Sequence, residues 1–363
     1  MSAQSLEDFV ESVGGQSHLR VEHDFGEGFV RLRTSEAERR QAAQDIQNTE
    51  NIVLELLRNS RDAHASRIFV AVSRNGDKRL LTVIDNGDGI PSQMHEHVFE
   101  PRVTSKLDTN HMDAWGMHGR GMALYSISVN ADEAHVASSE HNLGCSICVT
   151  TDIKKLPERA DQSSFPSFEL SDSGKVNVRG PRNILRTACE FALESRDTCS
   201  VYVGSPVEIA ATLFSYGMST LSTLDRVFCK DPEALPLSKR LAAASDPASF
   251  AESASQMGLD VSERSARRIM DGEIDELDPM LDQIILKDSR KKSGEAARGK
   301  RANVQADARS LKLTREDAAL LSIAVSAAYS EIAERYYLEA DVEPIVRVHR
   351  DRVVITVPVV KAP

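Results

Sequence analysis

The chain has 363 residues, with 44 lysines and arginines against 55 aspartates and glutamates, so its formal net charge is −11 at pH 7. This length allows two or three domains, and no apolar stretch is long enough to span a membrane, which excludes a membrane-embedded fold. The polar, acidic start and the five scattered cysteines predict a cytoplasmic protein without a signal peptide.

The first fifty residues predict one strand and one helix. Residues 28–33 have the composition of a strand, and the segment rich in Ala, Glu, Arg and Gln from 35 to 46 predicts a helix. We expect the strand to join the sheet of the domain that follows it. Exchange of the strand with a second copy of the chain is the alternative.

Apolar residues recur at helical spacing between residues 51 and 63, which predicts a helix. Glu55, Asn59 and Asp62 share the other face. A carboxylate one turn from an amide suits a triphosphate site, because the carboxylate can orient or deprotonate water and the amide oxygen can bind Mg²⁺. The alternative is an ordinary solvated helix face.

Residues 78–84 form an apolar and β-branched run that predicts a buried strand ending at Asp85. A single carboxylate there can accept a hydrogen bond from an exocyclic amine such as that of adenine. Gly87 and Gly89 would let the backbone lie flat against the base. The same residues also predict a tight turn, and the two interpretations are compatible.

Glycines 116, 119 and 121 directly precede residues 122–127, a short apolar run with helical character. Glycines expose backbone N–H groups, and the start of a helix adds a partial positive charge, so this block predicts a phosphate cradle. It is neither a P-loop nor a dinucleotide-binding fingerprint, because it lacks the Lys-Ser/Thr pair and does not follow the first strand of a βαβ unit.

These blocks resemble the superfamily of gyrase, heat-shock 90 chaperones, histidine kinases and MutL, which has a Bergerat-type ATP fold. The resemblance covers residues 50 to about 152 and is strongest to MutL and the topoisomerase VI B subunit. It implies an α+β protein with an ATP-binding α/β sandwich at 1–152, core 50–152, that uses ATP and Mg²⁺.

The resemblance also implies roles for single residues: Glu55 is the general base, Asn59 the magnesium ligand and Asp85 the adenine reader. Residues 91–115 would form a lid, in which Lys106 contacts the γ-phosphate or is simply a solvated lysine. The superfamily's last strand usually opens Gly-Thr, so the hydroxyl near adenine comes from Ser146 or is absent. The other expected nucleotide-binding residues are Asp62, Gly87, Gly89, Ile90, Thr104, Ser105, Gly116, Gly119, Arg120 and Gly121.

Within this lid, residues 98–101 look like those of sensor kinases, whereas residues 104–106 look like those of MutL. A sensor kinase needs a phosphoacceptor histidine on a helix. His23 is the nearest candidate, but the glycines at 26 and 28 break a helix there, so we reject autophosphorylation.

Beyond a loop at 154–174 we expect a small α/β unit and a helical region over 175–285, resembling a transducer by analogy only. The strands are expected at 175–179 and 200–203 and the helices at 183–193 and 207–214. A basic linker at 286–312 follows, in which Lys287 to Arg301 contact nucleic-acid phosphates or form a solvated tether.

Residues 313–363 predict a long helix and a hairpin. Thr314 and Asp317 form a capping box at the start of the helix, and the hairpin turns at residues 350–351. The helix is apolar nearly all round, so we expect it to be buried in its own domain or in a dimer.

Together these features predict an ATP-hydrolysing conformational switch that acts on DNA or a partner protein through ATP-gated dimerisation, with no membrane partner. The alternatives are a non-hydrolysing, ATP-dependent interaction module and a kinase of a partner protein.

Overall fold

The computed structural model describes residues 21–105, 111–113, 116–118, 121–159, 161–170, 176–222, 229, 231–284, 286–288, 315–336, 338, 344–348 and 353–357. The chain divides into two compact units, Met1–Lys292 and Ser293–Pro363. Within the described ranges, none of the helices has the length and apolar content needed to cross a membrane.

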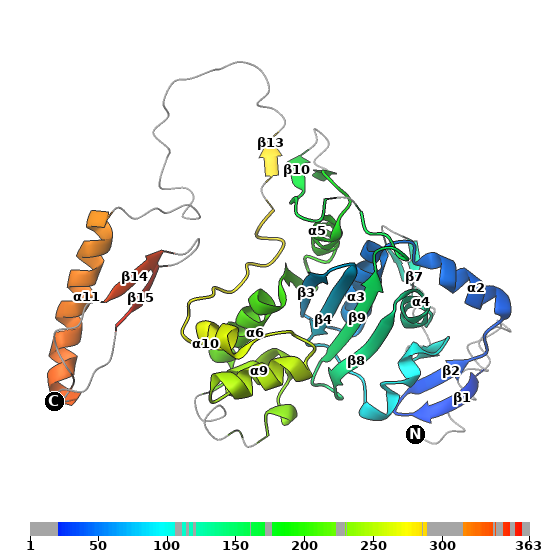
Figure 1. The fold of residues 1–363 in the computed structure, drawn as a ribbon, viewed down its shortest axis with the longest axis horizontal. Coiled ribbons are helices and arrows are strands. Elements are labelled where there is room, and N and C mark those ends of the chain that lie inside the picture. The colour runs from blue at the N-terminus through cyan, green and yellow to red at the C-terminus, as the bar shows by residue number, and fades with distance from the viewer. Residues whose placement is uncertain are drawn as a thin grey trace, which may run out of the picture. The chain divides into compact units, whose positions relative to one another are not determined.

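A five-stranded sheet forms the centre of the first unit (Figure 1). β3, β4, β9 and β8 are antiparallel to their neighbours, whereas β12 runs parallel to β3 at the edge. The order across the sheet is β12 (Ser200–Gly204), β3 (Arg67–Asn75), β4 (Lys78–Asp85), β9 (Cys145–Asp152) and β8 (Glu133–Ser139).

One face of this sheet is covered by α3 (Thr49–Asp62), α4 (Ala123–Asn130) and α5 (Ile184–Glu194). The helix α3 begins where the Asn48 side chain accepts a hydrogen bond from the backbone N–H of Asn51. Its apolar face packs on alternate residues of the strands, such as Ile68 and Val70 of β3. The mixed helix and sheet composition confirms the predicted α+β class.

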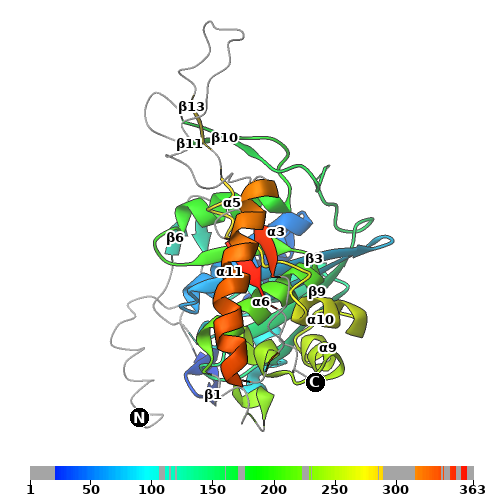
Figure 2. The ribbon, with the colours of Figure 1, turned by 90° about the vertical axis from the view of Figure 1, so that its left-hand side faces the viewer.

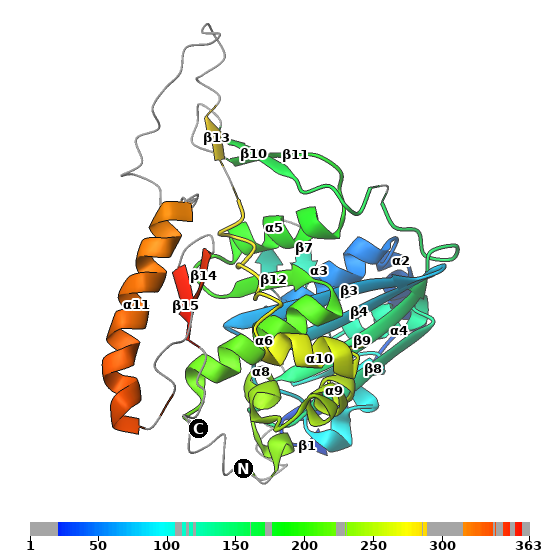
Figure 3. The ribbon, with the colours of Figure 1, turned by 60° about the vertical axis from the view of Figure 1, so that its left-hand side comes forward.

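The other face of the sheet is covered by α6 (Pro206–Thr220), α8 (Leu237–Arg240), α9 (Pro247–Gln256) and α10 (Glu263–Met270) (Figure 3). Phe69 of β3 and Ile84 of β4 point into this second core. The α/β elements predicted after residue 175 are therefore present. The strand expected at 200–203 is β12, which joins the same sheet as the elements before residue 152, whereas the strand expected at 175–179 belongs to another sheet. Short 3-10 turns, η3 (Pro232–Ala234) and η4 (Leu241–Ala243), connect the helices of this layer.

The N-terminal strand does not join the central sheet, contrary to expectation. It forms a hairpin of β1 (Val21–Gly26) and β2 (Phe29–Leu32), and β2 pairs with β5 (Val103–Thr104), which lies in the segment expected to form the lid. Apolar packing holds the hairpin in this position, because Phe25 and Phe29 contact a small core of Met94, Val98 and Val103. The remaining elements of this region are α2 (Glu36–Asp45), η1 (Ser92–Met94), η2 (His97–Phe99), and the pair β6 (His111–Asp113) and β7 (Gly116–His118).

A second three-stranded sheet also belongs to this unit (Figure 2). β10 (Ser167–Leu170) pairs with β11 (Val176–Arg179) and, in parallel, with β13 (Leu286–Asp288). The segment expected to be a loop at 154–174 thus contains a strand, and the expected linker begins with one. The rest of the basic segment, from residue 289, lies outside the described residues.

The second unit consists of α11 (Arg315–Tyr336) and the antiparallel hairpin of β14 (Ile345–Val348) and β15 (Val353–Thr356). The helix and hairpin were predicted, although Thr314 and the turn at 350–351 lie outside the described residues. The expectation that the helix is buried nearly all round in its own domain is wrong, because one face is exposed. Leu321 and Val325 are partly buried, whereas four large apolar residues are half exposed or more: Leu320 66%, Ile323 67%, Ile332 50% and Tyr336 69%.

Candidate nucleotide site

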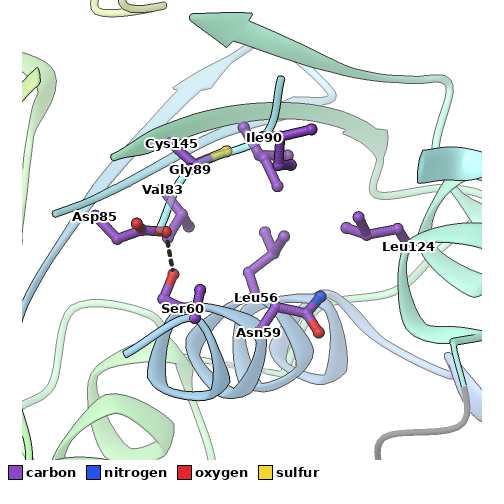
Figure 4. A pocket seen from close by; sticks show the side chains of 11 residues that line it. Leu56, Asn59, Ser60, Val83, Asp85, Gly89, Ile90, Leu124 and Cys145 are labelled. Atoms are coloured by element: carbon purple, nitrogen blue, oxygen red, sulfur yellow. Dashed lines mark hydrogen bonds between the residues drawn. The ribbon is translucent and has the colours of Figure 1, made fainter. Parts of the chain in front are cut away.

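A cavity lies between α3, the ends of β4 and β9, and the start of α4 (Figure 4). Asp85 and Leu124 stand at its opposite ends, and the walls between them are mostly apolar. The residues that line it are Leu56, Asn59, Ser60, Ala63, Val83, Asp85, Gly89, Ile90, Leu124, Cys145 and Ile147.

Asp85 is held at the end of β4 with its carboxylate buried. Ser60 Oγ donates to Oδ2 at 2.8 Å, and the backbone N–H of Gly87 donates to Oδ1 at 2.9 Å. Loss of solvent around the carboxylate raises its pKa from 3.8 to about 6, although these hydrogen bonds work in the opposite direction. A buried carboxylate in an apolar cavity is suited to accept a hydrogen bond from an amine of a flat, apolar ligand.

The two glycines after Asp85 have no room for a side chain. A Cβ on Gly87 would collide with the backbone carbonyl of Ala63, and one on Gly89 with that of Glu140. Gly89 also has φ +73°, a conformation that disfavours other residues. The turn therefore brings backbone close to the cavity, and Ser139 Oγ secures its end by accepting from Ile90 N at 2.7 Å.

One face of α3 lines the cavity, through Leu56, Asn59, Ser60 and Ala63. The Asn59 side chain points into the cavity region between Leu56 and Leu124 (Figure 4). Its Nδ2 atom is buried and has no hydrogen-bond partner in the described part of the chain. A buried polar group of this kind is costly unless a ligand or water completes it.

Glu55 and Asp62 flank this face and do not line the cavity. Glu55 Oε1 accepts from Arg58 Nη1 at 2.5 Å, within the same helix. The Asp62 carboxylate pairs with Arg61 Nε at 3.4 Å. The expected general base thus lies beside Asn59 on the helix but is engaged by a buried arginine.

The opposite end of the cavity has the features expected of a phosphate cradle. The helix α4 begins at Ala123 without a side-chain cap, so its first backbone N–H groups remain available for an anion. Gly121, with φ +67°, precedes it, and Thr104 and Ser105 lie in the adjoining lid segment. Gly116 is the first residue of β7. Lys106, Gly119 and Arg120 lie outside the described residues.

Ser146 does not reach the cavity, which corrects the expectation from the sequence. Its hydroxyl is on the opposite face of β9, where it donates to the carbonyl of Met257 at 2.7 Å. Side chains alternate along a strand, so the preceding residue, Cys145, lines the cavity instead. Burial raises the pKa of the Cys145 thiol well above its usual range, so the thiol stays uncharged where it lines the cavity.

Of the residues that line the cavity, only Asn59, Asp85, Gly89 and Ile90 were predicted from the sequence. The apolar wall residues, together with Ser60 and Cys145, were missed. Ser60 could have been found, because it follows Asn59 and shares a helix face with Leu56 and Ala63. Cys145 could not, because its orientation depends on the register that pairs it with Asp85.

Among the described residues, the site offers too few ligands to hold a metal ion without help from other groups. The described residues contain no group of three or more His, Cys, Asp or Glu side chains that could hold a metal ion. Magnesium commonly takes only one or two protein ligands and completes its shell with water and substrate phosphates. The Asn59 amide beside an uncapped helix start meets that requirement.

Comparison with known proteins agrees with this geometry. Residues 44–155 match the family described as histidine kinase-, DNA gyrase B-, and HSP90-like ATPase. The DNA mismatch repair protein MutL of Chlorobium phaeobacteroides (strain BS1) is 35% identical over 167 residues, which are 45% of this chain and 26% of that protein. MutL of Aquifex pyrophilus is 40% identical over 105 residues, 28% of this chain and 24% of that protein.

The chain therefore spans about a quarter of the length of these two relatives. Among solved structures, the N-terminal domain of a DNA repair protein is similar at 19% identity, over 41% of this chain and 57% of that one. Its TM-score of 0.24 is too low to support a conclusion.

Proposed function

We propose that this chain, whose residues 44–155 form a domain of the histidine kinase-, DNA gyrase B- and HSP90-like ATPase superfamily, binds Mg-ATP and hydrolyses it as a conformational switch. One observation carries the proposal: an apolar cavity with a buried carboxylate, Asp85, at one end and the uncapped start of α4 at the other. These two ends match the amine of adenine and the phosphates.

The residues divide the work accordingly. Asp85 accepts a hydrogen bond from the base, and the turn at Gly87 and Gly89 packs on its plane. The phosphates lie against Gly121 and the first turn of α4. Mg²⁺, held by the Asn59 amide oxygen, would neutralise phosphate charge, and Glu55 would orient or deprotonate the attacking water.

The test is phosphate release from ATP by the wild type and by Glu55→Gln, with ATP affinity measured in parallel. The glutamine keeps an oxygen for Arg58, so that arginine is not left as an unpaired buried charge. Loss of a general base predicts a fall in turnover of roughly 100-fold with little change in affinity. Glu36→Gln, an exposed change on α2, is the matched control. Equal turnover by wild type and Glu55→Gln would remove Glu55 from the mechanism.

A second function, that of an ATP-dependent interaction module with little hydrolysis, is supported by the Glu55–Arg58 ion pair. A base held by a neighbouring cation is less free to take a proton from water. If the wild type binds ATP but releases no phosphate, this module becomes the better description. Transfer of the γ-phosphate to an added protein, detected with labelled ATP, would instead support a kinase of a partner.

The partners of the switch are a second copy of the chain or another protein, in the cytoplasm. Contact with nucleic acid through Lys287 to Arg301 is a further candidate, suggested by the basic segment and by the name of the MutL relatives. We do not extend the proposal to mismatch repair, because the chain spans only about a quarter of those proteins. DNA binding at low salt that is lost on neutralising Lys291, Lys292, Lys300 and Arg301 would support it.

A further inference from the structure

The N-terminal hairpin is attached directly to the lid segment that adjoins the phosphate cradle. Strand β2 pairs with β5 through Val30 opposite Thr104 and Arg31 opposite Val103. The backbone N–H of Leu32 extends this pairing by donating to the carbonyl of Arg102 at 3.0 Å. A lid strand of only two residues therefore depends on the hairpin for its backbone hydrogen bonds.

Arg102 makes the side-chain contacts that secure this attachment. Its Nη1 donates to the carbonyl of Arg33 at 3.0 Å and pairs with Glu38 Oε1 at 3.3 Å. The side chain is only 12% exposed. Its backbone has φ +56°, a strained conformation for a non-glycine residue that its contacts must maintain.

The backbone of Arg102 also touches the phosphate cradle. A Cβ on Gly121 would lie 3.3 Å from Arg102 Cα and 3.2 Å from Thr104 Cβ. The backbone of Arg102 and the Cβ of Thr104 therefore lie directly against this glycine. A shift of Arg102 would move atoms that pack on Gly121, at the entrance of α4.

A second ion pair supports the same segment from its other end. Arg31 Nη1 pairs with Glu100 Oε2 at 2.5 Å, and His97 Nδ1 lies 2.7 Å from Glu100 Oε1. Partial burial raises the pKa of Glu100, but the contacts with His97 and Arg31 together outweigh it, so the pKa lies below its usual value. Both ends of the segment from Glu100 to Thr104 are therefore tied to the hairpin.

We propose that Arg102 is a positioning residue for the triphosphate: by fastening the lid strand to the N-terminal hairpin and α2, it sets Thr104 and Gly121 in place for the terminal phosphates. This inference rests on the proposed function, since it concerns the same nucleotide site. Asp85 lies at the opposite end of the cavity from Leu124 (Figure 4), so we expect base recognition to depend less on Arg102 than phosphate binding does.

The test is to compare the affinities of ATP and AMP for the full chain. In Arg102→Ala, we expect the ATP-to-AMP affinity ratio to fall at least tenfold while AMP affinity stays within about twofold of wild type. Arg102→Lys, which keeps the charge beside Glu38, should recover part of the ratio. Arg40→Ala is the control, because Arg40 is an exposed arginine of α2 that pairs with Glu36.

Glu38→Gln provides an independent variant if Arg102→Ala fails to fold. Glu38 also closes the capping box of α2 with Ser35, and glutamine preserves that role while removing the charge that Arg102 meets. We expect a two- to fivefold fall in the same ratio. An unchanged ratio in the folded variants, or equal losses for ATP and AMP, would overturn the inference. Absence of ATP binding by the wild type would instead overturn the proposed function.

Discussion

At the scale of single residues, Asp85 shows how a binding group is kept in an unfavourable state. Its pKa of about 6 against an ordinary 3.8 means that the folded protein takes up its proton more readily than the unfolded chain. Above pH 6 the buried charge costs roughly 3 kcal/mol of folding free energy, and the cost disappears as the pH falls towards 4. Perturbed carboxylates of this kind are typical of functional sites.

Asp85→Asn should therefore separate stability from binding. The amide can keep contacts with Ser60 and Gly87, so we expect the free energy of unfolding to rise by about 1–3 kcal/mol at pH 8, with the gain shrinking towards pH 4. ATP affinity should fall at least tenfold. In the wild type, ATP affinity should weaken as the pH drops below about 6. Urea unfolding and calorimetric titration at each pH measure both effects, and wild-type ATP affinity in the variant would contradict the assigned role.

The position of Ser146 shows what a residue pattern alone leaves undetermined. The sequence identifies a strand after Gly144 and a hydroxyl near its start, but the face on which that hydroxyl lies depends on the pairing of β9 with β4. In the observed register Cys145 lies opposite Asp85, so the next side chain turns to the other face. There the Ser146 hydroxyl donates a hydrogen bond to the carbonyl of Met257 and so links β9 to the end of α9.

At the scale of elements, the central strands are apolar on both faces, and this has a consequence for the layers around the sheet. In β3, Ile68 and Val70 face one core while Phe69 and Ala71 face the other. A strand that is apolar on both faces requires cover on both sides. The same apolar pattern underlies the strands expected at 78–84 and 200–203, which the structure has as β4 and β12. The sequence does not predict that α6, α8, α9 and α10 supply the second cover, because that packing joins residues more than a hundred positions apart.

This second layer should behave as part of the ATP-binding unit. The turn after α9 docks on the sheet, where Thr82 Oγ1 donates to the carbonyl of Gly258 at 2.7 Å. Gly258 has φ +75°, and a Cβ there would collide with Cys148 Sγ of β9. Gly272 has a similar φ of +70° but nothing within 4 Å of its Cβ position. The two glycines therefore differ in packing and not in backbone conformation.

We expect Gly258→Ala to lower the free energy of unfolding by about 1–3 kcal/mol more than Gly272→Ala, because overpacking adds to a similar backbone strain. Urea unfolding followed by circular dichroism measures the difference. If the layer is integral to the unit, the whole helical and strand signal shifts in one transition. Equal effects of the two changes would show that the turn does not pack tightly on β9.

At the scale of the whole molecule, the second unit is too small to bury its own apolar residues. One helix and a two-stranded hairpin provide little cover, and such a hairpin is marginally stable unless something packs on it. The exposed residues of α11 form a continuous stripe along the helix. Its apolar members are Leu320, Ile323, Ala324, Ala327, Ala328, Ile332 and Tyr336.

Four members of the stripe are placed symmetrically about Ala328, whereas Ile323 and Ala327 have no exposed counterpart. Leu320 and Tyr336 lie equally far from Ala328, as do Ala324 and Ile332. In an antiparallel pair of α11 helices related by a two-fold axis at Ala328, Leu320 of one helix would face Tyr336 of the other. The alanines would lie where the two helices cross. Self-complementarity of this kind is what a two-fold interface requires. A second copy of the chain is therefore the partner that we expect on this surface.

Substitution at the symmetry axis tests this dimer directly. In a two-fold pair the residue at 328 meets itself, so Ala328→Glu should convert a dimer to a monomer by like-charge repulsion, and Ala328→Lys should do the same. Mixing the two variants should restore the dimer, because opposite charges then face each other. Size-exclusion chromatography with light scattering measures all three samples, with Ala248→Glu, an exposed position on α9, as the control. A monomeric wild type, or a mixture that stays monomeric, would contradict pairing at α11.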